Sequence, residues 1–128
     1  MTSPQRGKPS SRSFASVTVT TEADGLSEAV NITGLTLSAI RMSTAWTDAA
    51  LGFQASIDGT TNYFPVYNEL GNHLTYPTSA SRVIAFDPSV FAGFSWLKLE
   101  SKTTAGVAVA QAAARAIQLG LSEFVNAD

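Results

Sequence analysis

The chain has 128 residues, of which 45% are hydrophobic and 14% charged, and its formal net charge is −2. This length and apolar content suit one compact domain with a core of its own. The absence of cysteine excludes a disulfide framework and a thiolate metal site. No apolar run approaches the roughly 20 residues of a membrane span, and no apolar segment follows the basic N-terminal residues as it would in a secretory signal. We therefore expect a soluble chain, or one assembled into something larger, with no membrane partner.

Residues 1–12 differ in composition from the rest of the chain. They are rich in Pro, Ser and Gly and carry Arg6, Lys8 and Arg12 without any acidic residue. Such a segment buries too little surface to offset its ordering entropy, so it is either a disordered tail or an arm that becomes ordered on a neighbouring subunit. Three positive charges are too few for nucleic-acid binding as the main activity. We expect an N-terminal arm over 1–12, a single domain over 13–128 and no nucleic-acid partner.

Alternation of polar and apolar residues predicts short strands throughout residues 13–128. Asp58-Gly59 lies between two such runs and predicts a hairpin with a wide turn. Asp87 to Gly93 predicts a single helical turn with Asp87 as its N-cap. The Ala-rich segment 105–116 has helical propensity, and a helix is the alternative to the loop that we favour there. The strands are expected in 13–21, 31–42, 49–57, 62–67, 73–76, 81–86, 94–101 and 116–124.

Seven to nine short strands separated by turn signals predict an all-β fold. The architecture expected is an antiparallel β-sandwich or jelly roll with an extended N-terminal arm. No internal repeat and no second domain is visible in the sequence.

The residue types needed for catalysis do not form a recognisable set. His73 is the single histidine and no G-x-S-x-G elbow is present, so we expect it at a surface or interface and not in a catalytic triad. Most acidic residues fall in turns, where they cap backbone groups. Asp24-Gly25 and Asp58-Gly59 lack the ligand density of a calcium loop. The sequence therefore predicts no enzyme, no catalytic residues, no metal and no cofactor.

The two tryptophans have different sequence surroundings. Trp96 lies in an alternating strand and is expected in the core. Trp46 lies among polar residues and is expected in a loop, partly exposed, where it could contact either a sugar or a protein.

Three motifs follow one another along the chain and carry a family resemblance. Trp46 to Gly59 fits W-x-x-A-x-x-x-F-Q-x-S-x-D-G, Asp87 to Gly93 fits D-P-x-x-F-A-G, and Leu97 to Ser101 fits L-x-L-x-S. In this order they resemble small virion structural proteins of tailed bacteriophages. The resemblance covers roughly residues 35 to 121.

The resemblance implies a non-enzymatic, capsid-associated protein of the head decoration or cement type, made in the host cytoplasm and carried on the virion surface. Its partner would be the major capsid protein, and it would act as a homo-oligomer, expected to be a trimer. A position in the tail or fibre is an alternative. We expect Arg6, Lys8, Arg12 and Trp46 to contact the capsid. A carbohydrate-binding module, with an exposed aromatic platform at Trp46 or a tyrosine, is the other hypothesis.

Overall fold

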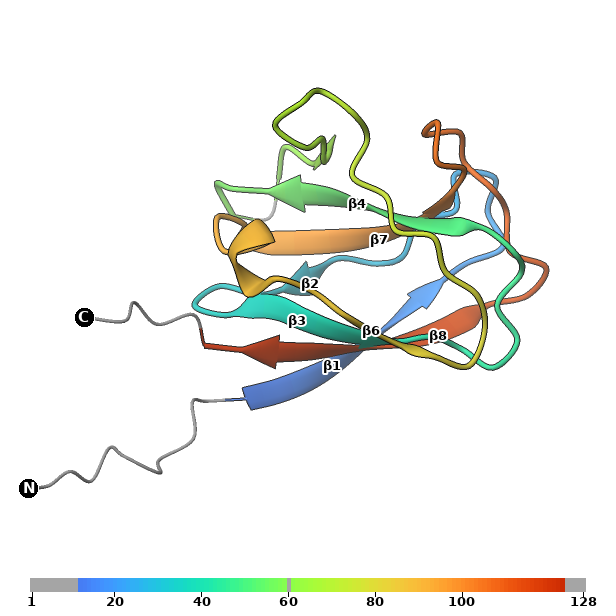
Figure 1. The fold of residues 1–128 in the computed structure, drawn as a ribbon, viewed down its shortest axis with the longest axis horizontal. Coiled ribbons are helices and arrows are strands. Elements are labelled where there is room, and N and C mark those ends of the chain that lie inside the picture. Colours follow the sequence, from blue (N-terminus) through green and yellow to red (C-terminus); the bar gives the residue numbers. More distant parts are fainter. Residues whose placement is uncertain (1–11, 60, 124–128) are drawn as a thin grey trace, which may run out of the picture.

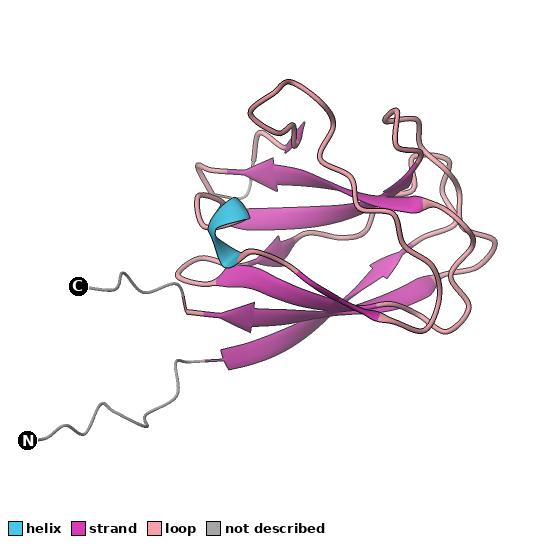
Figure 2. Cartoon of the chain, in the orientation of Figure 1, coloured by secondary structure: helices cyan, strands magenta, loops and turns pink. Residues whose placement is uncertain are grey.

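The computed structural model describes residues 12–59 and 61–123, which form eight β-strands and one short 3₁₀-helix (Figures 1 and 2). No α-helix is present in these residues, so the all-β prediction is confirmed for this part of the chain. The elements are β1 (Arg12–Val19), β2 (Val30–Asn31), β3 (Thr36–Arg41), β4 (Ala50–Ser56), β5 (Phe64–Pro65), β6 (Val83–Ala85), η1 (Pro88–Val90), β7 (Trp96–Lys102) and β8 (Arg115–Ser122).

The strands form two antiparallel four-stranded sheets. Sheet A has the order β1-β8-β3-β6 and sheet B the order β2-β7-β4-β5. In Figure 1 sheet A lies below and sheet B above. The first strand pairs with the last, the second with the seventh, the third with the sixth and the fourth with the fifth. The chain is therefore doubled back on itself at the β4–β5 hairpin, and the doubled chain is then wound into two layers.

The core is one cluster built from both sheets. Alternation sends Val17 and Val19 of β1 and Ile117 of β8 inward from sheet A, and Leu97 and Leu99 of β7 inward from sheet B. Burying an aliphatic side chain of this size contributes about 1.5–3 kcal/mol. Four aromatic rings add edge-to-face contacts to the cluster. They are Phe53, Tyr76, Phe86 and Phe91.

Most of the predicted strands are present at close to their expected positions. The break expected at Gly34 is real, since its φ of 80° lies in the left-handed region. The predicted hairpin pairs Ala55 with Phe64 across a wide loop. The Ala-rich segment is a loop that leads into β8, as favoured. The strand predicted over 73–76 is wrong, because His73 pairs back to Tyr67 whereas Tyr76 pairs with Leu51, so no continuous ladder forms.

Both tryptophans lie in places that differ from the prediction. Trp46 is only 6% exposed and belongs to the core cluster. Its Nε1 donates to the carbonyl of Ala49 at 3.0 Å, which satisfies the one polar group that burial would otherwise leave unpaired. Trp96 is half-buried on the outward face of sheet B, because Leu97 and Leu99 take the inward positions of β7.

Candidate binding surfaces

A row of small residues crosses the outward face of sheet A. Gly120 of β8 lies opposite Phe14 of β1 on one side and Ala39 of β3 on the other, and Ala39 lies opposite Ala85 of β6. Phe14 is 75% exposed and rises at one edge of this row. Because the central strands carry almost no side-chain volume here, the face is hollowed into a groove of about 430 Å³.

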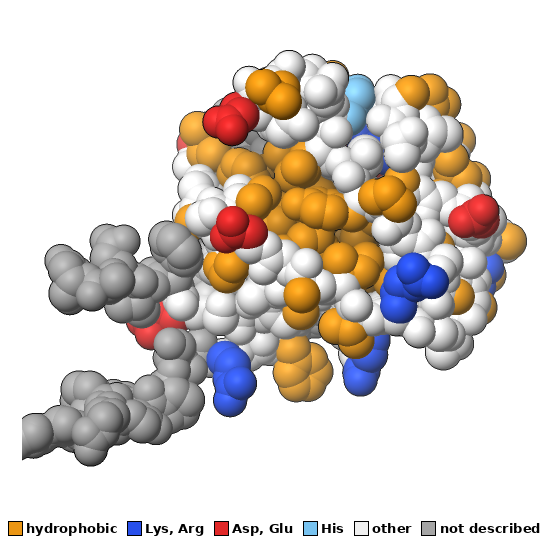
Figure 3. Space-filling model, viewed as in Figure 1, with side chains coloured by type: hydrophobic (Ala, Val, Ile, Leu, Met, Phe, Trp, Pro, Cys, Tyr) orange, Lys and Arg blue, Asp and Glu red, His pale blue; other side chains and the backbone are white. Residues whose placement is uncertain are grey.

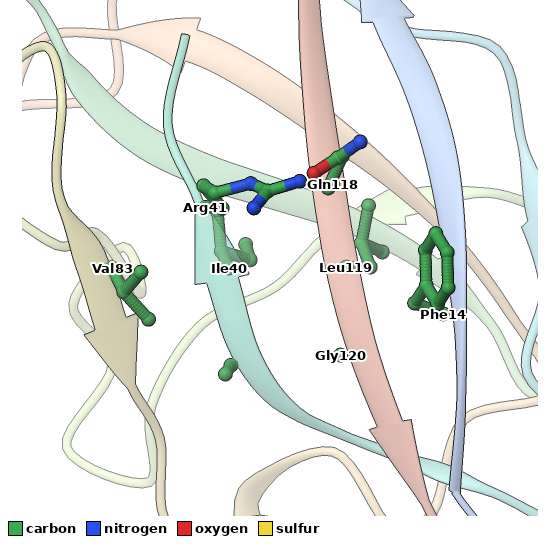
Figure 4. Close-up of a pocket in the computed structure, with 8 residues that line it drawn as sticks. Phe14, Ile40, Arg41, Val83, Gln118, Leu119 and Gly120 are labelled. Carbon is green, nitrogen blue, oxygen red and sulfur yellow. The ribbon is translucent and has the colours of Figure 1, made fainter.

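The neighbouring row supplies the polar part of this sheet A groove. Gln118 of β8 lies opposite Arg41 of β3, which in turn lies opposite Val83 of β6. Figure 4 shows the Arg41 and Gln118 side chains reaching toward each other, with Phe14 and Val83 on the two outer strands. The Oε1 atom of Gln118 is buried and has no hydrogen-bond partner among the described residues. The groove thus combines an apolar floor with one guanidinium and one unsatisfied amide oxygen.

The charges of sheet A are of one sign. Its four strands contain Arg12, Arg41 and Arg115 and no Asp or Glu. Arg115 is held at the end of the sheet, where it donates to Gln111 and Thr47. Arg12 and Arg41 are exposed. In Figure 3 most of the Lys and Arg side chains in view lie along the lower part of the molecule, the side of sheet A. This face is suited to an acidic and apolar surface.

A second hollow surface lies beside β5, the edge strand of sheet B. Two adjoining hollows of about 360 and 290 Å³ share Val66, Tyr67 and Phe94 in their walls. Tyr67 is 51% exposed. Its ring packs on His73 with centroids 4.3 Å apart, and its hydroxyl lies 3.2 Å from Nε2 of that histidine. We call this surface the Tyr67 cleft, and its volumes are at the lower end of the range for small-molecule sites.

Asn68 supplies an oriented polar group to the Tyr67 cleft. Its Oδ1 accepts from the backbone N–H groups of Leu70 and Asn72 at 2.9 and 3.0 Å. These two bonds fix the amide, and its NH₂ group makes no hydrogen bond within the described residues. The cleft therefore contains a half-exposed aromatic ring and an oriented amide NH₂ group that makes no hydrogen bond within the described residues.

A charged pair is buried on the outward face of sheet B. Lys102 and Glu100 are 3% and 7% exposed, and Nζ lies 2.8 Å from Oε1. That contact is electrostatic, without the alignment of a hydrogen bond, whereas Oε2 accepts from Gln54 at 3.3 Å. The lysine stem lies over Gly52, where an added Cβ would come within 2.5 Å of Cδ. None of the hollows described above is lined by this pair, so we assign it to stability.

The described residues contain no group of three or more His, Cys, Asp or Glu placed to hold a metal ion. His73, within that same part of the chain, has Tyr67 as its hydrogen-bond partner and an unpartnered, buried Nδ1. None of the helices in the described ranges is long and apolar enough to cross a membrane.

The predicted contact residues are separated by the structure. Arg12 begins β1, is exposed and lies on the same side of the strand as Phe14. Trp46 is buried, so its expected exposure is wrong and it offers no surface to a partner. Arg6 and Lys8 lie outside the described residues. Phe14 was not identified from the sequence as a surface residue. Its position was a signal, because it falls on the opposite face of β1 from Val17 and Val19.

Neither a protein-family model nor a curated protein matches this sequence. The resemblance to phage virion proteins therefore rests on the three motifs alone.

Proposed function

We propose that this protein is a non-enzymatic structural protein of a phage virion, a decoration or cement protein that binds the outer surface of the major capsid lattice and stabilises it. The observation that supports this best is the outward face of sheet A, where an apolar groove lies beside exposed guanidinium groups and the four strands contain no Asp or Glu. Its complement is an acidic patch with protruding apolar side chains on the capsid protein.

The strand pairing supports a finer description of the fold. Two four-stranded antiparallel sheets, with the chain doubled at β4–β5 before it is wound, are the arrangement of a β-sandwich of the jelly-roll type. This fold occurs in viral capsid and lectin domains. Because one fold hosts many functions, the step from this fold to a capsid function is an analogy. The proposal therefore rests mainly on the outward face of sheet A.

The sequence before β1 adds further positive charge. Arg6 and Lys8 precede Arg12 along the chain, with no acidic residue among them. A homo-oligomer that presents several such faces would gain avidity on a repeating lattice, since each further contact is made at high effective concentration.

The proposal is tested by heating purified phage heads with and without the added protein. We expect the protein to co-sediment with heads and to raise the temperature at which the capsid melts in calorimetry. An image of the decorated heads should show sheet A turned toward the lattice. Heads that bind no protein, or that melt at the same temperature with and without it, would contradict the proposal.

A carbohydrate-binding role is the second candidate, favoured by the Tyr67 cleft. The half-exposed Tyr67 ring and the oriented Asn68 amide are the stacking and hydrogen-bonding groups that a sugar uses. On a glycan array we expect binding that Tyr67→Phe retains and Tyr67→Ala loses, because phenylalanine keeps the ring. A silent array would remove this candidate and leave the capsid role unaffected.

A further inference from the structure

Strand β1 is an outer strand of sheet A, and part of its edge is open. It pairs with β8 on one side only. Within the described residues, no strand covers its other side, although residues 26–28 approach its C-terminal end through the Val19–Ser27 bridge. Arg12, Phe14 and Ser16, toward its N-terminal end, are all exposed. An open edge of this kind is a template for pairing with another strand.

The direction of the open backbone groups follows from one hydrogen bond. The N–H of Thr18 donates to the Glu28 carboxylate at 2.7 Å, so it points away from β8. Backbone groups of alternate residues in a strand point to the same side. The N–H and C=O groups of Phe14 and Ser16 therefore point outward as well, and no hydrogen bond satisfies them among the described residues.

The two ends of this edge carry opposite charges. Arg12 lies at the start of β1, whereas the Glu28 carboxylate lies at Thr18, close to its end. The two positions are six residues apart along the strand, a span of about 20 Å. The Arg12 guanidinium and the Glu28 carboxylate cannot meet within one chain. An antiparallel copy of the same edge, however, places the guanidinium of each copy beside the carboxylate of the other.

We propose that two copies of this chain pair antiparallel through β1, with Phe14 of each copy opposite Ser16 of the other. The two-fold axis makes the contact self-complementary. Phe14 and Ser16 then exchange N–H···O=C bonds twice over, about four bonds in all. The ladder ends at this pair of residues, because the Thr18 N–H is already bound to the Glu28 carboxylate. Arg12 of each copy then lies beside the Glu28 carboxylate of the other.

The paired copies form one continuous sheet of eight strands. Both sheet A grooves and both Phe14 rings then lie on the same side of that sheet, because pairing in register preserves the outward face of each strand. The inference stands on the edge geometry and does not require the capsid role. If that role holds, the pair presents two grooves to the lattice in place of one. A dimer also differs from the trimer expected from the sequence, so a measurement of the oligomeric state distinguishes the two expectations.

The test is a charge exchange across the pair, followed by sedimentation over a range of protein concentrations. The unchanged protein should form dimers. Arg12→Glu and Glu28→Lys should each raise the dimer dissociation constant by at least about tenfold, because each puts like charges together twice. The double variant should restore dimers, which is possible only through contact between copies, since the two positions are too far apart in one chain.

Arg82→Glu is the matched control. Arg82 is exposed and precedes β6, at the opposite edge of sheet A, so the same change of charge there should leave the dimer intact. Glu28→Gln keeps an acceptor for the Thr18 N–H and serves if Glu28→Lys does not fold, as judged by circular dichroism. It should weaken the dimer by less than the lysine variant. A monomer at all concentrations, single variants that dimerise normally, or a folded double variant that stays monomeric would each overturn the proposal.

Discussion

At the scale of single residues, the buried pair of Glu100 and Lys102 has the largest expected effect on stability. Removing charges from water costs several kcal/mol per ion, and the pair offsets that cost only while both members are present. Gln54 supplies one further hydrogen bond to the carboxylate. Each charge therefore offsets the desolvation cost of the other, and the pair adds little stability beyond that.

We expect Lys102→Met to lower the free energy of unfolding by about 3–5 kcal/mol, because it leaves the Glu100 carboxylate buried without a counter-charge. The combined variant Lys102→Met with Glu100→Leu should be clearly more stable than the single variant, since no charge then remains to be buried. Urea unfolding measures both. If the single variant unfolds like the unchanged protein, the pair is not buried in solution.

Gly106 is required for two separate reasons. Its φ is 92°, and an added Cβ would come within 2.3 Å of the His73 ring. Gly71 shares the positive φ, at 88°, but has nothing within 4 Å of such a Cβ. Alanine at Gly71 therefore measures only the free-energy cost of the left-handed backbone, whereas alanine at Gly106 adds the cost of the contact with His73.

Gly71→Ala should destabilise the fold by about 1–2 kcal/mol, the cost of a left-handed backbone for alanine. Gly106→Ala should cost at least about 1 kcal/mol more, because the methyl group forces His73 off its packing position against Tyr67. Thermal unfolding of the two variants gives the difference. Equal losses would show that the His73 ring moves aside freely.

At the scale of elements, the turn of η1 depends on Asp87. Its carboxylate accepts from the backbone N–H of Ser89 at 3.1 Å and from the Ser89 hydroxyl at 2.9 Å. These bonds, the backbone one first, hold the pKa of Asp87 below its usual value of 3.8. Since the folded-state pKa is the lower one, this group contributes stability above pH 3.8 that is lost as the pH falls through the folded-state value.

Asp87→Asn should therefore remove part of the acid sensitivity of the fold, because the amide oxygen accepts the same bonds without titrating. Unfolding measured between pH 6 and pH 2 should show a shallower loss for the variant than for the unchanged protein. Ser89→Ala removes only the hydroxyl donor and should shift the acid transition toward higher pH. Identical acid profiles for all three proteins would show that the cap is not formed.

The elements that could be predicted from the sequence are those specified locally. The apolar run over 49–53, the alternation over 54–57 and the Asp58-Gly59 turn sufficed for the central hairpin, and Asp87 with Pro88 sufficed for η1. The sheet A groove was not predictable in this way, because it exists only where Gly120, Ala39 and Phe14 come into register from three strands. Polar neighbours indicated an exposed Trp46, but its indole gains more from burial once Ala49 satisfies its N–H.

At the scale of the whole molecule, the two sheets differ in what they present outward. Sheet B covers its outward face with a buried ion pair and with a lysine, Lys98, whose Nζ lies 4.5 Å from the centre of the Tyr63 ring. Sheet A leaves its apolar groove and the guanidinium groups of Arg12 and Arg41 exposed. An open apolar face in a stable domain usually marks an interaction site. For the proposed capsid role we therefore expect sheet A to face the lattice. The Tyr67 cleft, which lies at the edge of sheet B, would not take part in that contact.

Reversing one charge on each sheet tests that orientation directly. Arg41→Glu should weaken head binding by at least about tenfold, because it places a carboxylate where an acidic capsid patch is expected. Lys98→Glu makes the same change of charge on sheet B and should bind heads normally. Binding of the unchanged protein should weaken as salt is raised from 50 to 500 mM, and the Arg41 variant should show a smaller salt dependence. Co-sedimentation with heads measures all of these. A loss of binding confined to the Lys98 variant would place the opposite face of the molecule on the capsid.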